Sequence, residues 1–283
     1  MSTNPAATTP VCPRHPDRVT YVRCQRCNRP TCGDCQRPAA VGFHCVDCVR
    51  QAAGTAPQVR TIFGGVNRGA VPVVVYTLIA INIVSYVLQH VLDTWTIDLL
   101  FYPYGGYFDQ WRFITGAFLH SESSPLHIAF NMYALWIVGV PLERMLGRVR
   151  LVTLYLVSAV GGHVMVLLFT TGPVLPGSAW LAGVVGASGA VFGLFGAILI
   201  VLKRLKVDYR GILATIVINT VIGFTVPGIS WEGHLGGLLT GLGLTVILTR
   251  VPREKQRAAA VWAPLVVVGV LVIAAMIKYS MYF

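Results

Sequence analysis

A serine flanked by glycines, in the segment GVVGASGAVFGLFG, could act as a nucleophile. Ser188 lies near the start of an apolar stretch, where a serine most often only hydrogen-bonds to its own helix. His234 opens another apolar stretch, in WEGHLGG. A histidine beside a serine can accept the hydroxyl proton, so Ser188 and His234 are a candidate nucleophile and general base.

Two further polar residues, His127 and Asn131, begin a third apolar stretch. They are four residues apart and share one face of a helix. Their side-chain N–H groups can donate to a developing oxyanion. The backbone N–H of Ser188, near a helix start, is a further free donor. Together these groups make a nucleophile, a base and an oxyanion hole, without a carboxylate to orient the base.

The N-terminal segment holds all seven cysteines, and with one histidine they form four pairs of two-residue spacing. The pairs are Cys12–His15, Cys24–Cys27, Cys32–Cys35 and Cys45–Cys48. Eight such ligands suffice for two tetrahedral zinc sites. The alternation predicts a cross-brace in which the first and third pairs bind one ion and the other two pairs bind the second. His44 is a spare ligand that could replace Cys45.

The alternative for the cysteines is a disulfide framework, which needs an oxidising compartment. Seven is an odd number, and the membrane topology below puts this segment in the cytoplasm. Zinc is therefore favoured, and it would supply most of the folding energy of so short a module. The arrangement resembles B-box-like zinc fingers, which implies a protein-interaction role. The first 70 residues hold nine Lys and Arg against three acidic residues, but part of this excess serves topology, so nucleic-acid binding is not expected.

The rest of the chain is apolar: 55% of all residues are hydrophobic and only 12% are charged, against about 25% charged in soluble domains. Several uncharged runs are long enough to cross a hydrocarbon core of about 30 Å. No signal peptide is expected, because no apolar stretch follows Met1 within the usual distance. The seven predicted spans are about Val71–Leu92, Leu126–Leu142, Leu151–Thr170, Val185–Leu202, Ile212–Val226, Gly233–Leu248 and Val261–Ile277.

The charges of the loops orient these spans. Three loops, Glu143–Arg150, Lys203–Arg210 and Arg250–Arg257, are rich in Lys and Arg, and the alternate loops are nearly bare. The positive-inside rule predicts a cytoplasmic N-terminus and an extracytoplasmic C-terminus. His127, Ser188 and His234 then lie at similar depth in the outer leaflet, where polar residues suggest function. The long aromatic loop before His127 is expected to form short helices in that leaflet.

Small residues recur every four positions near both candidate catalytic groups. The stripes are Gly189, Gly193 and Ala197 on one span and Gly233, Gly237 and Gly241 on another. Such stripes let helices approach closely, as a serine and an imidazole must to form a hydrogen bond. His163, in the middle of a span, is interpreted instead as a core histidine bonded to a neighbouring helix.

These segments together resemble the rhomboid family of intramembrane serine proteases, from about Tyr76 to Leu248. The resemblance rests on WRFITGAFLH, HIAFN, ERMLG, GASG and GHLGGLLTG, in this order. It implies Ser188 as nucleophile, His234 as base, and His127, Asn131 and the Ser188 backbone as oxyanion hole. Gly186, Gly189, Gly237 and Phe192 would pack around them. Phe192 departs from many bacterial relatives, which carry Tyr there.

The resemblance implies an all-α polytopic fold with a six-helix core and a seventh helix as an addition. We expect a zinc module in 1–52, a linker in 53–70, the core in 71–250, and a loop and seventh helix in 251–283. The expected partners are transmembrane protein substrates, the bilayer and a cytoplasmic partner of the module. The expected location is a bacterial plasma membrane.

Two other functions compete with a protease. A catalytically inactive rhomboid-like protein that binds or chaperones clients would usually lack the serine or the histidine, and both are present here. A transporter would show internal repeats and matching broken helices, and neither is visible in the sequence. The predicted reaction is hydrolysis of a peptide bond in or near a substrate's transmembrane segment.

Overall fold

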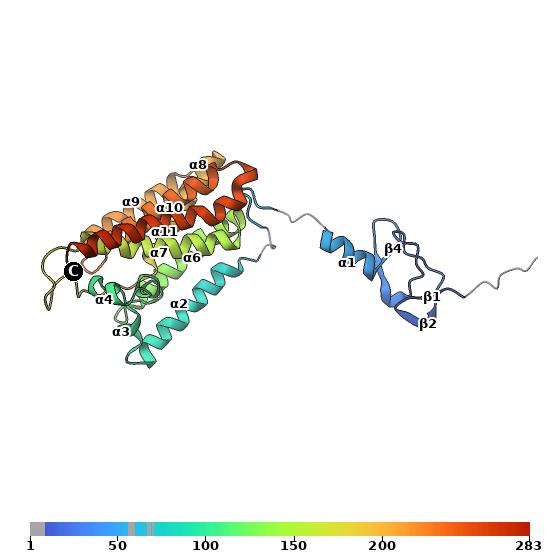
Figure 1. The fold of residues 1–283 in the computed structure, drawn as a ribbon, viewed down its shortest axis with the longest axis horizontal. Helices are drawn as coiled ribbons and strands as arrows, with labels where there is room; N and C mark the ends of the chain where they lie inside the picture. The colour runs from blue at the N-terminus through green and yellow to red at the C-terminus, as the bar shows by residue number, and fades with distance from the viewer. Residues whose placement is uncertain (1–8, 56–59, 67–68, 70) are drawn as a thin grey trace, which may run out of the picture. The chain divides into compact units, whose positions relative to one another are not determined.

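The computed structural model describes residues 9–55, 60–66, 69 and 71–283. The chain divides into two compact units, Met1–Gln58 and Val59–Phe283 (Figure 1). The first unit is small and holds little regular structure. The second is a bundle of long helices.

The first unit is built from two short antiparallel hairpins and one helix. Strands β1 (Val11–Cys12) and β2 (His15–Val19) pair so that Cys12 lies opposite His15. Strands β3 (Gln36–Pro38) and β4 (Phe43–Cys45) form the second hairpin, which leads into α1 (Val46–Thr55). A 3-10 turn, η1 (Gly33–Cys35), precedes β3.

Among its described residues, the second unit has seven long helices joined by loops, one of which contains short helices. The long helices are α2 (Val73–Val91), α6 (Pro125–Leu146), α7 (Arg148–Phe169), α8 (Ser188–Leu205), α9 (Arg210–Thr225), α10 (Trp231–Arg250) and α11 (Gln256–Ser280). A 3-10 turn, η3 (Arg253–Lys255), precedes α11. Each of the seven predicted spans coincides with one of these helices. The all-α polytopic fold predicted from the sequence is confirmed.

Five of these helices, α2, α6, α7, α8 and α11, are long and apolar enough by themselves to cross a membrane. The remaining two, α9 and α10, are not long and apolar enough by these measures. Helix α9 is apolar but has only 16 residues. Helix α10 has 20 residues, but they include five glycines and three threonines, which lower its mean hydropathy. Helix α10 packs against both α7 and α8, so much of its surface faces protein rather than lipid.

The loop between α2 and α6 contains α3 (Trp95–Leu99), α4 (Pro103–Phe108), α5 (Arg112–Thr115) and η2 (Gly116–Phe118). Arg112 is buried and holds this loop together. Its guanidinium donates to the carbonyl groups of Ile97 and Leu100 and pairs with Asp109. The short helices expected from the aromatic sequence are therefore present, with an arginine as their internal anchor.

Part of the region expected to be a linker, residues 53–70, has described structure. Gly54 belongs to α1, and Pro57 lies outside the described residues. Thr61–Val66 make a tight turn that packs onto the helix bundle, with Phe63 buried in the main core and its carbonyl bound by Arg150. Gly65 lies so close to the end of α6 that a Cβ would overlap the Leu146 carbonyl. Residues 61–66 therefore pack with the helix bundle.

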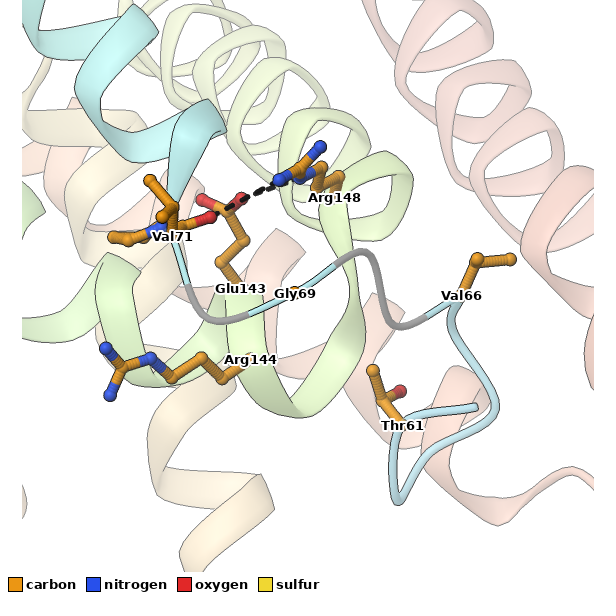
Figure 2. Close-up of a pocket in the computed structure, with 8 residues that line it drawn as sticks. Thr61, Val66, Gly69, Val71, Glu143, Arg144 and Arg148 are labelled. Atoms are coloured by element: carbon orange, nitrogen blue, oxygen red, sulfur yellow. Dashed lines mark hydrogen bonds and ion pairs between the residues drawn. The ribbon is translucent and has the colours of Figure 1, made fainter. Parts of the chain in front are cut away.

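The entry into α2 is fixed by Glu143, which is buried at the end of α6 (Figure 2). Its carboxylate accepts from the N–H groups of Val74 and Val75, at 3.2 and 3.0 Å. Arg148 pairs with the same carboxylate at 3.4 Å and donates to the Val71 carbonyl. The pocket beside them holds about 10 Å³, room for no more than about one water molecule. This ion pair and helix cap fasten α2 to α6.

Candidate active site

Ser188 is the first residue of α8 and follows a glycine with an unusual backbone. Gly186 has φ +135°, a conformation that residues with a Cβ rarely adopt. Its N–H donates to the Gly116 carbonyl at 3.1 Å, which ties the entry of α8 to the loop before α6. The first N–H groups of a helix have no partner within it. Among the described residues the Ser188 N–H has no backbone acceptor, so it can face a ligand.

His127 points into the same corner. Its Nδ1 accepts a hydrogen bond from the Ser121 backbone N–H at 3.1 Å, so in the neutral ring the proton sits on Nε2. A Cβ built on Gly186 would lie 3.0 Å from His127 Nε2 and 3.5 Å from Ser188 Oγ. The Nε2–H donor and the serine hydroxyl therefore converge on one small space that only glycine leaves open.

Asn131 lies one turn after His127 on α6 and is buried. Its Nδ2 donates one hydrogen to the His127 carbonyl at 2.9 Å. An amide carries two donor hydrogens, so one remains for a ligand. Asn131 therefore keeps a donor while the other fixes its side chain.

His234 lies in the first turn of α10. Its ring stacks flat on Phe192, with the ring centroids 4.2 Å apart and the planes at 13°. Phe192 is one turn after Ser188 on α8. His234 Nδ1 is buried beside Gly223 of α9 and has no hydrogen-bond partner within the described chain. The imidazole is thus held by stacking rather than by an acidic residue.

The residues next to Ser188 and His234 touch each other. A Cβ on Gly189 would lie 3.2 Å from the Gly233 carbonyl oxygen, and one on Gly237 would overlap the Gly189 carbonyl. The two side chains therefore extend from neighbouring points of two closely packed helices. No hydrogen bond joins Ser188 Oγ to His234 in the part of the chain that the structure describes. Catalytic hydrogen bonds are often long without substrate.

Two other histidines have different surroundings. His163 is buried, stacks on Phe101 and bonds through Nδ1 to the Phe113 carbonyl at 2.9 Å. It is the core histidine that the sequence suggests, bonded to α5. His120 was not among the predicted site residues, yet its ring lies 5.3 Å from that of His127, centroid to centroid.

His120 is held from α2. The Gln89 side chain accepts from the His120 N–H at 2.8 Å and donates to its carbonyl at 2.9 Å. Burial, with His127 nearby, lowers the pKa of His120 to about 3. The signal for this contact is a polar stripe on an otherwise apolar helix: Asn82, Ser85 and Gln89 are all buried and follow helical spacing.

The cysteines and His15 form two clusters within the first unit. One contains Cys12, His15, Cys32 and Cys35, and the other contains Cys24, Cys27, Cys45 and Cys48. In each, the ligand atoms lie within 4.8 Å of one another. These are the two sets that the alternating pairs predict, and His44 belongs to neither. Each cluster could hold a metal ion.

The contacts within the clusters suit a tetrahedral metal. Cys27 and Cys45 Sγ are 3.7 Å apart, which excludes a disulfide and is near the ~3.8 Å between thiolates on one zinc ion. His15 Nδ1 lies 3.2 Å from Cys32 Sγ and 3.4 Å from Cys35 Sγ. Burial raises the pKa of Cys24, but backbone N–H groups, that of Cys45 first, lower it to about 6. Thiolates are the form that binds metal.

Comparison with known proteins places most of the bundle in one family. The family model described as Rhomboid domain matches residues 107–251. The chain is 39% identical over 138 residues to Rhomboid protease GluP of Bacillus subtilis, covering 47% of this chain and 25% of that protein. It is 35% identical over 153 residues to RHOMBOID-like protein 6, mitochondrial, of Arabidopsis thaliana, covering 52% and 46%.

A third relative is matched over more of its length. The chain is 26% identical over 212 residues to Rhomboid protease AarA of Providencia stuartii, covering 64% of this chain and 74% of that protein. The matches to the first two relatives span less than half of those proteins. The matched residues 107–251 include Ser188, His234, His127 and Asn131 but not the cysteine clusters.

Proposed function

Because the chain belongs to the rhomboid family, we propose that it is an intramembrane serine endopeptidase that cleaves other membrane proteins in or near their transmembrane segments. One observation carries the proposal. Gly189 and Gly233, which adjoin Ser188 and His234, contact each other, and the His234 ring lies on Phe192. This contact holds together the two helices that carry the candidate nucleophile and the candidate base.

In the proposed reaction, Ser188 Oγ attacks the carbonyl carbon of the scissile bond and His234 takes the hydroxyl proton. Since Nδ1 faces Gly223, we assign the base function to His234 Nε2. The tetrahedral intermediate collapses, the C–N bond breaks, and His234 returns the proton to the leaving amine. Water then attacks the acyl-serine, with His234 again as base, and releases the new carboxyl group and the free serine.

The oxyanion of each tetrahedral intermediate would be bound beside Gly186. His127 Nε2–H, the second N–H of Asn131 and the Ser188 backbone N–H are the proposed donors. The hydrogen bond from Ser121 supports this role, since it keeps the His127 proton on Nε2. Preorganised donors of this kind lower the barrier because they need no rearrangement as charge develops.

The substrate follows from the location of the site. A spanning helix hides its carbonyl groups in internal hydrogen bonds, so a substrate must unwind locally before attack. The family resemblance implies a small residue before the scissile bond, and helix-breaking residues nearby would favour cleavage. The chain is a multi-pass membrane protein, and we propose a bacterial plasma membrane with the N-terminus in the cytoplasm and the C-terminus outside. A cytoplasmic partner of the cysteine module is part of the same proposal, and nucleic acid is not.

The first test uses Ser188→Ala and His234→Ala with a model transmembrane substrate in proteoliposomes. Both should abolish cleavage and leave the melting temperature in detergent unchanged. The unmodified protein should also react with a fluorophosphonate, and Ser188→Ala should not. A folded protein that neither cleaves nor labels would favour the alternative, a catalytically inactive rhomboid-like protein that binds or chaperones membrane clients.

We further propose that the two cysteine clusters bind one structural zinc ion each, and that catalysis needs no cofactor. Zinc would join segments that bury little apolar surface by themselves. Purified full-length protein should contain about two zinc ions, and Cys32→Ser should reduce this to about one. His44→Ala, which removes a metal-binding residue type outside both clusters, is the control and should retain both ions. Zinc near zero in the unmodified protein would contradict this assignment.

A further inference from the structure

Helix α11 ends against the loop that carries the short helices (Figure 1). Tyr279, in its last turn, is buried, and its hydroxyl donates to the Pro103 carbonyl at 2.8 Å, where α4 begins. Gly106 of α4 leaves the space for this side chain, since a Cβ there would lie 2.8 Å from the Tyr279 hydroxyl oxygen. Helix α11 therefore supplies the hydroxyl for this contact, and α4 supplies the space.

Aromatic rings extend the contact around the end of the helix. Phe283 stacks on Tyr107 of α4, with ring centroids 4.8 Å apart and planes at 15°. The fully buried Trp180 packs against Tyr282, and its carbonyl accepts from the Tyr104 N–H at 2.9 Å. The end of α11 thus holds α4 and the segment before α8 in one cluster.

Two backbone hydrogen bonds, linked by short stretches of chain, lie between this cluster and the site. The Phe101 carbonyl, two residues before Pro103, accepts from the Val184 N–H at 2.7 Å. Two residues further on, the Gly186 N–H donates to the Gly116 carbonyl at 3.1 Å. Gly186 is the residue whose missing side chain leaves room for His127 Nε2 and Ser188 Oγ. Displacement of α4 would therefore reach the corner where these two groups converge.

A groove beside this cluster makes the contact at the end of α11 important. The groove holds about 570 Å³ and is lined by residues of α4, α5, α7 and α11. Side chains of the described residues do not fill this space, and the last turn of α11 is one of the places where α11 contacts the other side of the groove. No similar role follows for the middle of α11, where residues such as Val270 are exposed.

We propose that α11 braces the active site, with Tyr279 as a positioning residue that acts through Pro103 and the 101–116 segment on Gly186. This inference rests on the proposed protease function. It assigns the seventh helix a part in catalysis although α11 lies outside the family match at residues 107–251. The predicted effect falls on the rate of the chemical step rather than on substrate binding, because only the alignment of Ser188 with its oxyanion donors changes.

The test compares Tyr279→Phe with Tyr282→Phe in the full-length protein. The first removes the hydroxyl that binds Pro103, and the second removes a hydroxyl on the same turn that has no hydrogen bond among the described residues. Loss of one hydrogen bond predicts a fall in kcat of about 3- to 10-fold for Tyr279→Phe, with KM changed less than about twofold. The rate of fluorophosphonate labelling should fall in parallel, and Tyr282→Phe should match the parent.

Hydrogen exchange of the backbone provides a readout that does not depend on activity. Amides of 104–108 and 184–187 should exchange faster in Tyr279→Phe than in Tyr282→Phe. Unchanged exchange would overturn the brace, and faster exchange with unchanged kcat would overturn its role in positioning. If the unmodified protein neither cleaves nor labels, the proposed function fails, and the exchange data still decide whether α11 braces the loop.

Discussion

His234 is oriented by an aromatic ring. Within the described chain its Nδ1 has no carboxylate or carbonyl partner, and the stacked Phe192 is its main lateral contact. A base held without a third hydrogen-bonding group depends on packing to keep its ring in line with the nucleophile. The phenyl ring itself, and not a hydroxyl on it, makes the stacking contact with His234.

Phe192→Leu should therefore lower kcat by about 10-fold or more, because an aliphatic side chain fills the space but cannot present a flat face. Phe192→Tyr keeps the ring and should retain kcat within about threefold. Melting temperatures in detergent would show whether either variant is misfolded. Equal loss of kcat in the two variants would mean that the ring does not orient His234.

His120 should make the free energy of unfolding depend on pH. Burial, with His127 nearby, lowers its pKa to about 3, whereas an unfolded chain has an ordinary histidine pKa of about 6.5. Between these values the unfolded chain binds a proton that the folded protein does not, so the free energy of unfolding falls as pH falls from about 6.5 towards 3.

His120→Gln should flatten this dependence, since glutamine does not titrate. The measurement is the melting temperature in detergent from pH 7 to pH 5, for the variant and the parent protein. Other groups titrate in both proteins, so the difference between the two slopes isolates His120. Identical slopes would show that His120 is not a buried neutral group.

At the scale of elements, the site depends on how closely α8 and α10 approach. Gly237 faces the Gly189 carbonyl, and Gly241 faces that of Gly193, with no room for a Cβ at either position. Backbone atoms cannot move aside as the end of a flexible side chain can. A methyl group there must separate the helices and with them Ser188 and His234.

Gly237→Ala should therefore destabilise the bundle by about 1–3 kcal/mol and reduce activity more than this loss of folded protein explains. Gly243→Ala is the matched control on the same helix, because a Cβ at Gly243 meets nothing within 4 Å. The control should be neutral or slightly stabilising, as alanine favours a helix more than glycine does. Chemical unfolding in detergent and turnover of the folded fraction measure both effects. Similar behaviour of the two variants would remove helix approach as the cause.

At the scale of the molecule, the chain divides into two compact units, Met1–Gln58 and Val59–Phe283. The turn Thr61–Val66 contributes Phe63 to the main core and a carbonyl to Arg150. The first unit, in contrast, consists of hairpins around the two cysteine clusters and has its own small core. The helix bundle should not need the first unit to fold.

Deletion of residues 1–58 should leave cleavage of a model substrate in proteoliposomes within a few-fold of full length. Deletion of residues 1–66 removes Phe63 as well and should lower the melting temperature, since loss of a buried phenylalanine costs about 3–5 kcal/mol. The shorter deletion is the control for the longer one. A folded but inactive protein after the shorter deletion would show that the two units are coupled.

The sequence alone determined the features that depend on local chemistry. Apolar runs interrupted by charged loops predicted seven helices, because each span must satisfy its own backbone in lipid. The two-residue spacing and alternation of the cysteine pairs predicted both clusters, since ligands on one tight turn reach one metal. The small-residue stripes indicated which helices approach each other. The assignment of Ser188, His234, His127 and Asn131 as site residues remains a proposal for the variants above to test.

Only the tertiary structure decided features that join segments distant in the chain. The Gln89 contacts with His120, the docking of Thr61–Val66 and the Tyr279 bond to Pro103 link residues 31, 87 and 176 positions apart. No local periodicity encodes such pairs, because each residue alone fits an ordinary polar, loop or interfacial position. Their partners are fixed by how the helices pack, and that packing depends on the whole bundle at once.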